Sequence, residues 1–152
     1  MTLPDDLRLI VFTDLNFPLI HTLVDESKRE GYEFVQRTID DWNSGANKFS
    51  GAGEALWGLF SGTELIGIGG LSRDPYADDH KTGRVRHLYI REAYRRKGYA
   101  TLLMNTIIDK GRRHFNVLRL FTDTPAAAEF YETLGFKKAN GYKASHIIAF
   151  PD

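Results

Sequence analysis

The 152-residue chain contains no cysteine. This absence excludes disulfide bonds, a thiol nucleophile and a thiolate metal site. The apolar runs are far shorter than the roughly 20 residues that a membrane-spanning helix needs. The first ten residues, MTLPDDLRLI, lack the basic and then apolar layout of a signal peptide. We therefore expect a cytoplasmic protein with no membrane partner.

Net charge is also absent, since 20 Lys and Arg balance 20 Asp and Glu. The two signs are nevertheless separated along the chain. Residues 81–119 contain eleven Lys or Arg against Glu92 and Asp109, which gives this segment a charge of +9. Such a polarised chain can hold an anionic ligand in one place and a cationic ligand in another. The length and the 42% hydrophobic content predict a single domain over residues 1–152.

Apolar periodicities and turn residues predict an alternation of strands and helices. The order is β α α β β β α β α β β, which favours a mixed α/β sheet with parallel neighbours near its centre and helices on both faces. The expected strands are Leu7–Phe12, Ala55–Phe60, Leu65–Leu71, Arg84–Ile90, Leu118–Asp123 and two short strands around a turn at Asn140–Gly141; the expected helices are Asn16–Glu30, Glu33–Asn43, Tyr99–His114 and Pro125–Leu134.

The stretch REAYRRKGYA, residues 91–100, joins a predicted strand to a predicted helix. The first turn of a helix attracts anions, because its N–H groups have no partner within the helix. Gly98 can bring the main chain close to a phosphate or adopt a left-handed conformation, and Arg95, Arg96 and Lys97 add positive charge. The stretch is neither a Walker loop nor a dinucleotide fingerprint. Taken alone, it is more typical of a solvated helix start.

The surrounding motifs make this loop more specific. RRKGYA places Arg95, Gly98 and Ala100 on a Gln/Arg-x-x-Gly-x-Gly/Ala pattern, and AAEFYETLGF, residues 127–136, adds a Phe-Tyr pair followed by Leu-Gly-Phe. With both motifs, residues 84–136 resemble the acetyl-CoA-binding core of the GNAT superfamily of N-acetyltransferases. The resemblance implies the acyl-CoA N-acyltransferase fold: a mixed central sheet whose two parallel strands splay apart, with helices on both faces.

The resemblance also implies a set of residues that bind the co-substrate acetyl-CoA. Main-chain groups of Leu88, Tyr89 and Ile90 would pair with the pantetheine arm of coenzyme A. Main-chain amides at the start of the helix would hold its pyrophosphate, so that the implied binding residues there are Arg95, Arg96, Lys97, Gly98, Tyr99 and Ala100. Thr124 stands where many relatives have an asparagine that contacts the pantetheine; it would keep this contact or only cap the following helix.

Tyr131 matches the tyrosine that, in this family, donates a proton to the sulfur of coenzyme A. A phenol with the ordinary pKa of about 10 is protonated at neutral pH and can act as an acid toward a thiolate. The alternative is that Tyr131 only packs on the apolar face of its helix. The Phe-Tyr-x-x-Leu-Gly-Phe setting favours the catalytic role.

The sequence does not identify the general base. His87 lies in an apolar strand, and strand alternation directs it away from the face that Arg84 and Arg86 share, unless a bulge shifts the register. His146 and Glu33 are further candidates. The resemblance adds a fourth possibility, deprotonation of the amine through ordered water.

The resemblance places the acceptor between the first two helices and the closing strand loops. Acidic residues are frequent there and predict an acidic rim suited to a cationic amine, namely Asp25, Glu26, Glu30, Glu33, Asp40, Asp41, Asp74, Asp78 and Asp79. Arg84 or Arg86 would instead meet a carboxylate on the acceptor. The expected acceptor is a small amine or an amino-acid-like molecule, attacked directly in a ternary complex.

Several alternatives remain open at this point. The chain would be a non-catalytic acyl-CoA-binding module if Tyr131 only packs, or an acetyltransferase of protein lysines or N-termini if its acceptor is a protein. The basic segment 81–119 suggests nucleic-acid binding, but no helix-turn-helix or RNA-binding signature accompanies it. We expect no nucleic-acid partner and no metal. A homodimer is neither indicated nor excluded.

Overall fold

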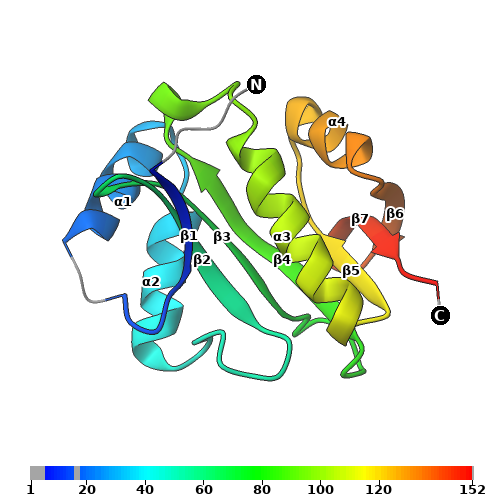
Figure 1. Ribbon diagram of the computed structural model, residues 1–152. Coiled ribbons are helices and arrows are strands. Elements are labelled where there is room, and N and C mark those ends of the chain that lie inside the picture. The colour runs from blue at the N-terminus through cyan, green and yellow to red at the C-terminus, as the bar shows by residue number, and fades with distance from the viewer. Residues whose placement is uncertain (1–5, 16–17, 152) are drawn as a thin grey trace.

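The computed structural model describes residues 6–15 and 18–151, which form one mixed sheet with helices on both faces (Figure 1). The strands follow the order β1-β2-β3-β4-β5-β7-β6, and every neighbouring pair is antiparallel except β4 and β5. The elements are β1 (Leu7–Val11), α1 (Leu19–Arg29), α2 (Phe34–Ser44), β2 (Ala55–Ser61), β3 (Glu64–Arg73), β4 (Thr82–Ile90), the short 3-10 helix η1 (Glu92–Tyr94), α3 (Tyr99–His114), β5 (Val117–Leu120), α4 (Pro125–Thr133), β6 (Lys137–Gly141) and β7 (Ala144–Ala149). The predicted fold class and element order are confirmed.

The helix boundaries follow the local signals of the sequence. Helix α3 spans the predicted residues, and Pro125 opens α4 after its cap at Thr124. Helix α1 is followed by Gly31, whose φ of +90° is the left-handed conformation that ends helices. The first residues of the predicted helix, Asn16 and Phe17, lie outside the described residues.

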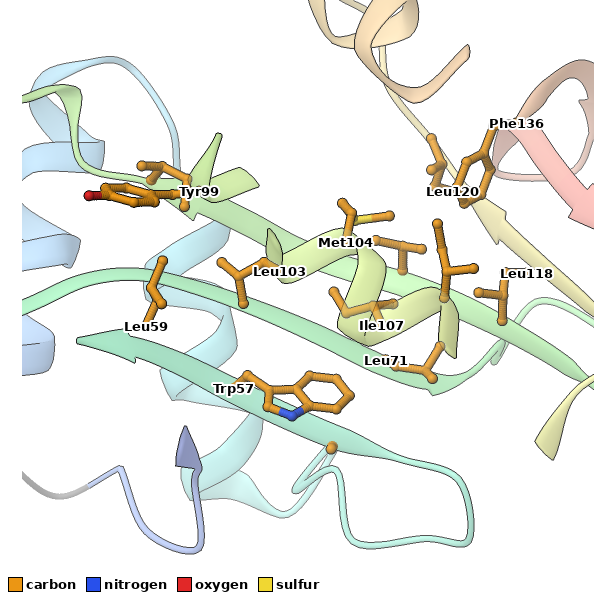
Figure 2. Close-up of a cluster of buried hydrophobic side chains, with 14 of the residues drawn as sticks. Trp57, Leu59, Leu71, Tyr99, Leu103, Met104, Ile107, Leu118, Leu120 and Phe136 are labelled. Atoms are coloured by element: carbon orange, nitrogen blue, oxygen red, sulfur yellow. The ribbon is translucent and has the colours of Figure 1, made fainter. Parts of the chain in front are cut away.

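Two apolar cores lie on opposite faces of the sheet. Helices α1 and α2 cover one face, where Leu23 and Val35 are buried against strand residues such as Leu56. Helix α3 crosses the other face and buries Leu103 and Ile107 (Figures 1 and 2). The sheet is therefore covered on both faces, and its strand ends and edges are what remains for a ligand.

The two parallel strands separate soon after they meet. β4 and β5 are paired only at Thr82 with Val117, Gly83 with Leu118 and Arg84 with Arg119, although β4 continues to Ile90. β5 ends early, at Leu120, because the next paired amide, that of Thr122, donates to the Ser145 hydroxyl at 2.9 Å instead of to a main-chain carbonyl. The strand predicted over Leu118–Asp123 is therefore too long by its last three residues. The predicted splay between the parallel strands is confirmed.

The closing hairpin turns two residues later than expected. Gly141 still pairs with Ala144, so Tyr142 and Lys143 form the turn, with Lys143 at a φ of +58°. The prediction of a turn at Asn140–Gly141 is wrong. Contacts distant in sequence account for the shift: the Tyr142 ring meets Tyr76 edge-on at 5.8 Å, and the Tyr142 carbonyl accepts a hydrogen bond from Arg119.

None of the helices within residues 6–15 and 18–151 is both long enough and apolar enough to cross a bilayer.

Candidate active site

A cavity of about 760 Å³ opens where β4 and β5 diverge. It has two ends, which we call the loop end, near α3 and α4, and the arginine end, near α2 and the β3–β4 loop. Its lining residues at the loop end include Leu88, Ile90, Arg95, Arg96, Ala100, Thr122, Asp123, Thr124, Ala127, Phe130 and Tyr131, and those at the arginine end include Tyr32, Phe34, Arg37, Asp41, Tyr76, Arg84, Arg86 and His87.

The cavity brings together most of the residues predicted to bind a cofactor or to act in catalysis. Eight of them line it: Leu88, Tyr89, Ile90, Arg95, Arg96, Ala100, Thr124 and Tyr131. Lys97, Gly98 and Tyr99 do not line it, and the Tyr99 side chain is buried in the core beneath α3. Any contact from these three residues would have to come from the main chain at the helix start, which is how the sequence motif was interpreted.

The turn before α3 presents main-chain N–H groups that have no protein partner. Gly98 precedes the helix with a φ of +84°, and Arg96 has a φ of +63°. Within the described residues, the amides of Arg96, Lys97 and Gly98 donate no hydrogen bond. A helix start with a tight turn and unpaired amides forms an anion-binding concavity. The expected left-handed conformation of Gly98 is confirmed.

The side chain of Arg95 binds to neighbouring protein groups although the residue is exposed. Its two terminal nitrogens donate to the two carboxylate oxygens of Glu30 at 2.7 and 2.6 Å, and its Nε donates to the Ile90 carbonyl at 2.9 Å. The guanidinium is therefore already satisfied by a fork-to-fork pair. Arg95 joins the end of α1 to the end of β4 and thereby fixes the start of the loop.

Tyr89 extends this network on the face covered by α1. Its hydroxyl lies 2.8 Å from a Glu26 carboxylate oxygen and also contacts Glu30. Burial and these carboxylates raise the pKa of Tyr89 well above its ordinary range. The hydrogen bonds from Arg95, above all, hold the pKa of Glu30 below its usual value. The hydroxyl of Tyr89 is thus engaged in a structural network, and the residue also lines the cavity.

Tyr131 lies on α4 with its ring among apolar neighbours. Its ring centre is 5.3 Å from that of Phe130 and 5.8 Å from that of Phe136. Burial raises the pKa of Tyr131 to about 12, so the hydroxyl keeps its proton throughout the neutral range. No residue in the described part of the chain makes a hydrogen bond to that hydroxyl. The side chain lines the cavity and also packs, so both roles considered from the sequence are compatible with its position.

Thr124 caps helix α4. Its Oγ1 accepts a hydrogen bond from the Ala127 amide at 3.3 Å, and the side chain also lines the cavity. The cap predicted from the sequence is confirmed, and a contact between Thr124 and a cofactor stays a prediction.

A bulge in β4 changes which side chains face the arginine end. The register with β3 shifts between the pairs Ile68 with Tyr89 and Gly70 with Arg86, and His87 has a φ of +54°. The extra residue lets His87 contact Thr38 and Phe34 of α2, and both Arg86 and His87 line the cavity. The structure therefore contains the bulge named from the sequence as the exception to strand alternation at His87.

His87 is held as a neutral imidazole. The Thr38 hydroxyl donates its proton to the Phe34 carbonyl at 2.9 Å, so its oxygen accepts from the His87 Nδ1–H and the lone pair lies on Nε2. Burial, followed by the charges of Arg86, Arg37 and Arg84, lowers the pKa of His87 to about 3.

The arginine end is not acidic. Of the nine acidic residues expected to form a rim, only Asp41 lines the cavity. Glu26 and Glu30 are engaged by Tyr89 and the arginines around it. The fully buried Asp74 lies 3.5 Å from an Arg84 nitrogen and 3.2 Å from Arg119 Nε. The expectation of an acidic rim is wrong, because eight of the nine residues do not line the cavity, and Glu26, Glu30 and Asp74 among them have partners inside the protein.

The other two candidate bases lie outside the cavity lining. His146 is buried and contacts Ser145 at Nδ1 and Glu132 at Nε2, at 2.9 and 2.8 Å. Glu33 is exposed at the start of α2. Neither residue is placed to take a proton from a molecule in the cavity.

Sequence reasoning missed Arg37, Tyr76 and Thr38 at this end. Arg37 and Thr38 belong to α2, where helical periodicity identifies the buried face but not the residues that reach across to β4. Tyr76 is in a loop, and its contacts with Arg84, Tyr142 and Lys143, which are distant in sequence, reveal its position.

Comparisons with known proteins agree with this geometry. Residues 17–136 match the family model described as "Acetyltransferase (GNAT) family". A protein from Exiguobacterium sp. 255-15, described as an acetyltransferase, has a structure with a TM-score of 0.85 and 26% identity over 95% of this chain and 93% of its own. A GNAT-family acetyltransferase from Staphylococcus aureus Mu50 has a TM-score of 0.72 at 15% identity, covering 93% and 96% of the two chains.

A third similar structure is a GNAT-family acetyltransferase from Elizabethkingia anophelis, with a TM-score of 0.61 at 16% identity over 90% of this chain and 79% of its own. The chain belongs to the acetyltransferase (GNAT) family. It is an acetyl-CoA-dependent acetyltransferase.

Proposed function

We propose that this enzyme transfers the acetyl group to the primary amine of a small molecule, with residues 1–152 acting as one domain. One observation carries the proposal: a single cavity is lined by a strand edge that β5 leaves unpaired, by Arg96, the first of three residues whose amides donate no hydrogen bond before α3, and by Tyr131, whose hydroxyl has no partner among the described residues. The Elizabethkingia anophelis structure contains bound acetyl-CoA, and this likeness supports the same ligand here.

In this proposal the loop end holds acetyl-CoA. The amides of residues 96–100 bind its pyrophosphate, and the main chain of residues 88–90 binds the pantetheine arm as a strand binds an added neighbour. Because Arg95 Nε already donates to the Ile90 carbonyl, we assign the arm's contacts to the other main-chain groups of this segment. Thr124 and Ala100 border the same channel.

The transfer is a direct attack within a ternary complex. A C–N bond forms between the amine and the acetyl carbon, and the C–S bond breaks. The amine loses one proton and the sulfur gains one, which Tyr131 donates and then recovers from solvent. We assign the amine's proton to water, because a pKa of about 3 makes His87 a weak base.

The test is the Tyr131→Phe variant. Loss of a positioned acid should lower kcat by about a hundredfold or more, while acetyl-CoA binding measured by calorimetry stays within twofold of the wild type. Tyr142→Phe is the matched control, since Tyr142 is 69% exposed and lies outside the cavity lining. An unchanged kcat in Tyr131→Phe would remove the catalytic role.

The assay can follow free coenzyme A with a thiol reagent, because the protein itself has no cysteine. Amines, amino acids and peptides serve as the acceptor panel. Intersecting initial-velocity lines would support a ternary complex. Acetyl-CoA binding without transfer to any acceptor would favour the acyl-CoA-binding module, and transfer confined to protein lysines would reject a small-molecule acceptor.

A further inference from the structure

The arginine end of the cavity has more positive charge than its neighbours neutralise. Arg37 from α2 and Arg84 and Arg86 from β4 all line it, whereas Asp41 is the one acidic side chain that lines this end within the described residues. The bulge in β4 is what adds His87 to the same wall without turning Arg86 away.

The pairing of these arginines is incomplete. Arg84 shares the buried Asp74 with Arg119, so one carboxylate serves two guanidinium groups. The Nη1 atom of Arg84 is buried and makes no hydrogen bond within the part of the chain that the structure describes. The side chains of Arg37 and Arg86 have neither a hydrogen bond nor an ion pair there; Arg86 is half-buried and Arg37 is exposed.

The buried Nη1 of Arg84 is the costly group, because burial removes water that no protein group replaces. The side-chain nitrogens of Arg37 and Arg86 are not buried in this way and stay accessible to a molecule that enters the cavity. Arginine is also the side chain whose planar fork best fits phosphate and carboxylate oxygens. Two unpaired arginines facing one cavity, with a third that is only partly neutralised, therefore match a ligand with two negative charges. The charges of all three arginines also reach His87, whose neutral state they help to maintain.

The walls limit the size of such a ligand. The Tyr76 ring lies 5.0 Å from Arg84 Cζ, and Phe34 lies 6.1 Å from the His87 ring. The cavity of about 760 Å³ must also admit the end of the cofactor arm, so the space at the arginine end suits a small molecule.

We infer that the acetyl acceptor is a small amine that carries two negative charges, as a phosphate monoester or a pair of carboxylates does, and that Arg37 and Arg86 bind these charges. This inference rests on the proposed function. The neutral His87 and the aromatic walls complete the binding site beside the anionic group.

The first experiment compares matched acceptors at a fixed acetyl-CoA concentration. Phosphoethanolamine should exceed ethanolamine, and L-glutamate should exceed L-alanine, each by tenfold or more in kcat/KM; putrescine should be the poorest. In Arg86→Gln the preference for phosphoethanolamine over ethanolamine should fall by about 10- to 100-fold, the effect expected for losing a hydrogen bond to a charged group. Arg113→Gln is the control, because Arg113 is exposed on α3 and outside the cavity. Equal or better use of ethanolamine and putrescine would overturn the inference.

A second measurement separates failure of this inference from failure of the proposed function. Thermal unfolding is followed with saturating coenzyme A, which occupies the loop end, while phosphate or glutarate is added. We expect both anions to raise the Tm of the wild type and of Arg113→Gln, and to raise that of Arg86→Gln much less. If these Tm increases are observed but no amine is acetylated, the anion site is supported and the proposed function is rejected. If the enzyme acetylates amines but the anions raise the Tm of the wild type and of Arg86→Gln equally, the proposed function stands and the anion site is rejected.

Discussion

The two ends of the cavity differ in the groups that line them: main-chain groups prevail at the loop end and side chains at the arginine end. At the loop end the ligand-facing groups are main-chain amides and a strand edge, and the side chains of Arg95 and Tyr89 are used to brace them. At the arginine end the cavity is lined by side chains from α2, β4 and a loop, and those of Arg37 and Arg86 have no hydrogen bond or ion pair within the part of the chain that the structure describes. In the proposed function, the loop end therefore serves the reaction in general, and the arginine end selects the acceptor.

The difference between the two ends is tested most strongly by the pH dependence of stability, which reports on His87 at the arginine end. The folded pKa of His87 is about 3, below the 6.5 of a free histidine, so the unfolded chain binds a proton that the folded chain does not. The contribution of the neutral His87 to the free energy of unfolding is fully present above pH 6.5 and is lost as the pH falls toward 3. His87→Asn keeps an amide donor for Thr38 and tolerates the positive φ, but does not titrate.

Urea unfolding at pH 7.5 and 4.5 measures this difference. The wild type should lose about 2 kcal/mol more than His87→Asn between the two values. His21→Asn, an exposed change on α1, should follow the wild type. Parallel losses in the wild type and His87→Asn would show that the arginine end does not suppress the charge of His87.

A smaller effect is expected from the backbone of the loop end. Gly98→Ala places a Cβ on a residue with a φ of +84°, which should cost about 1 kcal/mol of unfolding free energy. Gly45→Ala is a close match, because Gly45 also has a φ of +84° and has no atom within 4 Å of an added Cβ. Both variants should lose similar stability, but only Gly98→Ala should weaken acetyl-CoA binding, by about tenfold. Equal acetyl-CoA affinities in calorimetry would contradict an amide cradle at this turn.

The smallest effect is the coupling of Arg95 with Glu30. A double-mutant cycle of Arg95→Gln and Glu30→Gln should give a coupling of about 0.5 to 1 kcal/mol, since the side chains are 38% and 22% exposed and water screens the pair. The Asp109 and Arg113 pair, 3.9 Å apart and 72% and 66% exposed, should give less than about half of that. If the two cycles agree, Arg95 does not brace the loop.

The loop end could be predicted because its rules are local. A glycine before a helix and a threonine followed by proline act within a few residues, and Gly98 and Thr124 lie where these signals placed them. The Phe-Tyr pair is placed by the family resemblance, and Tyr131 lines the cavity. The arginine end could not be predicted in this way. It depends on a one-residue bulge beside His87 and on whether each carboxylate finds a partner elsewhere, as Asp74 does with Arg119. Neither fact leaves a periodic trace in the sequence.

The three-residue pairing of β4 with β5 has a consequence for aggregation. Beyond Arg84, β4 presents an unpaired strand edge inside the molecule, of the kind that on an outer strand recruits other chains. Here Ala100 of α3 and Tyr131 of α4 line the cavity beside this edge, so the edge lies inside the cavity and not at the rim of the sheet. The same unpaired edge would promote aggregation at the rim of a sheet. Between the diverging β4 and β5 it is enclosed, and in the proposed function it binds one small partner.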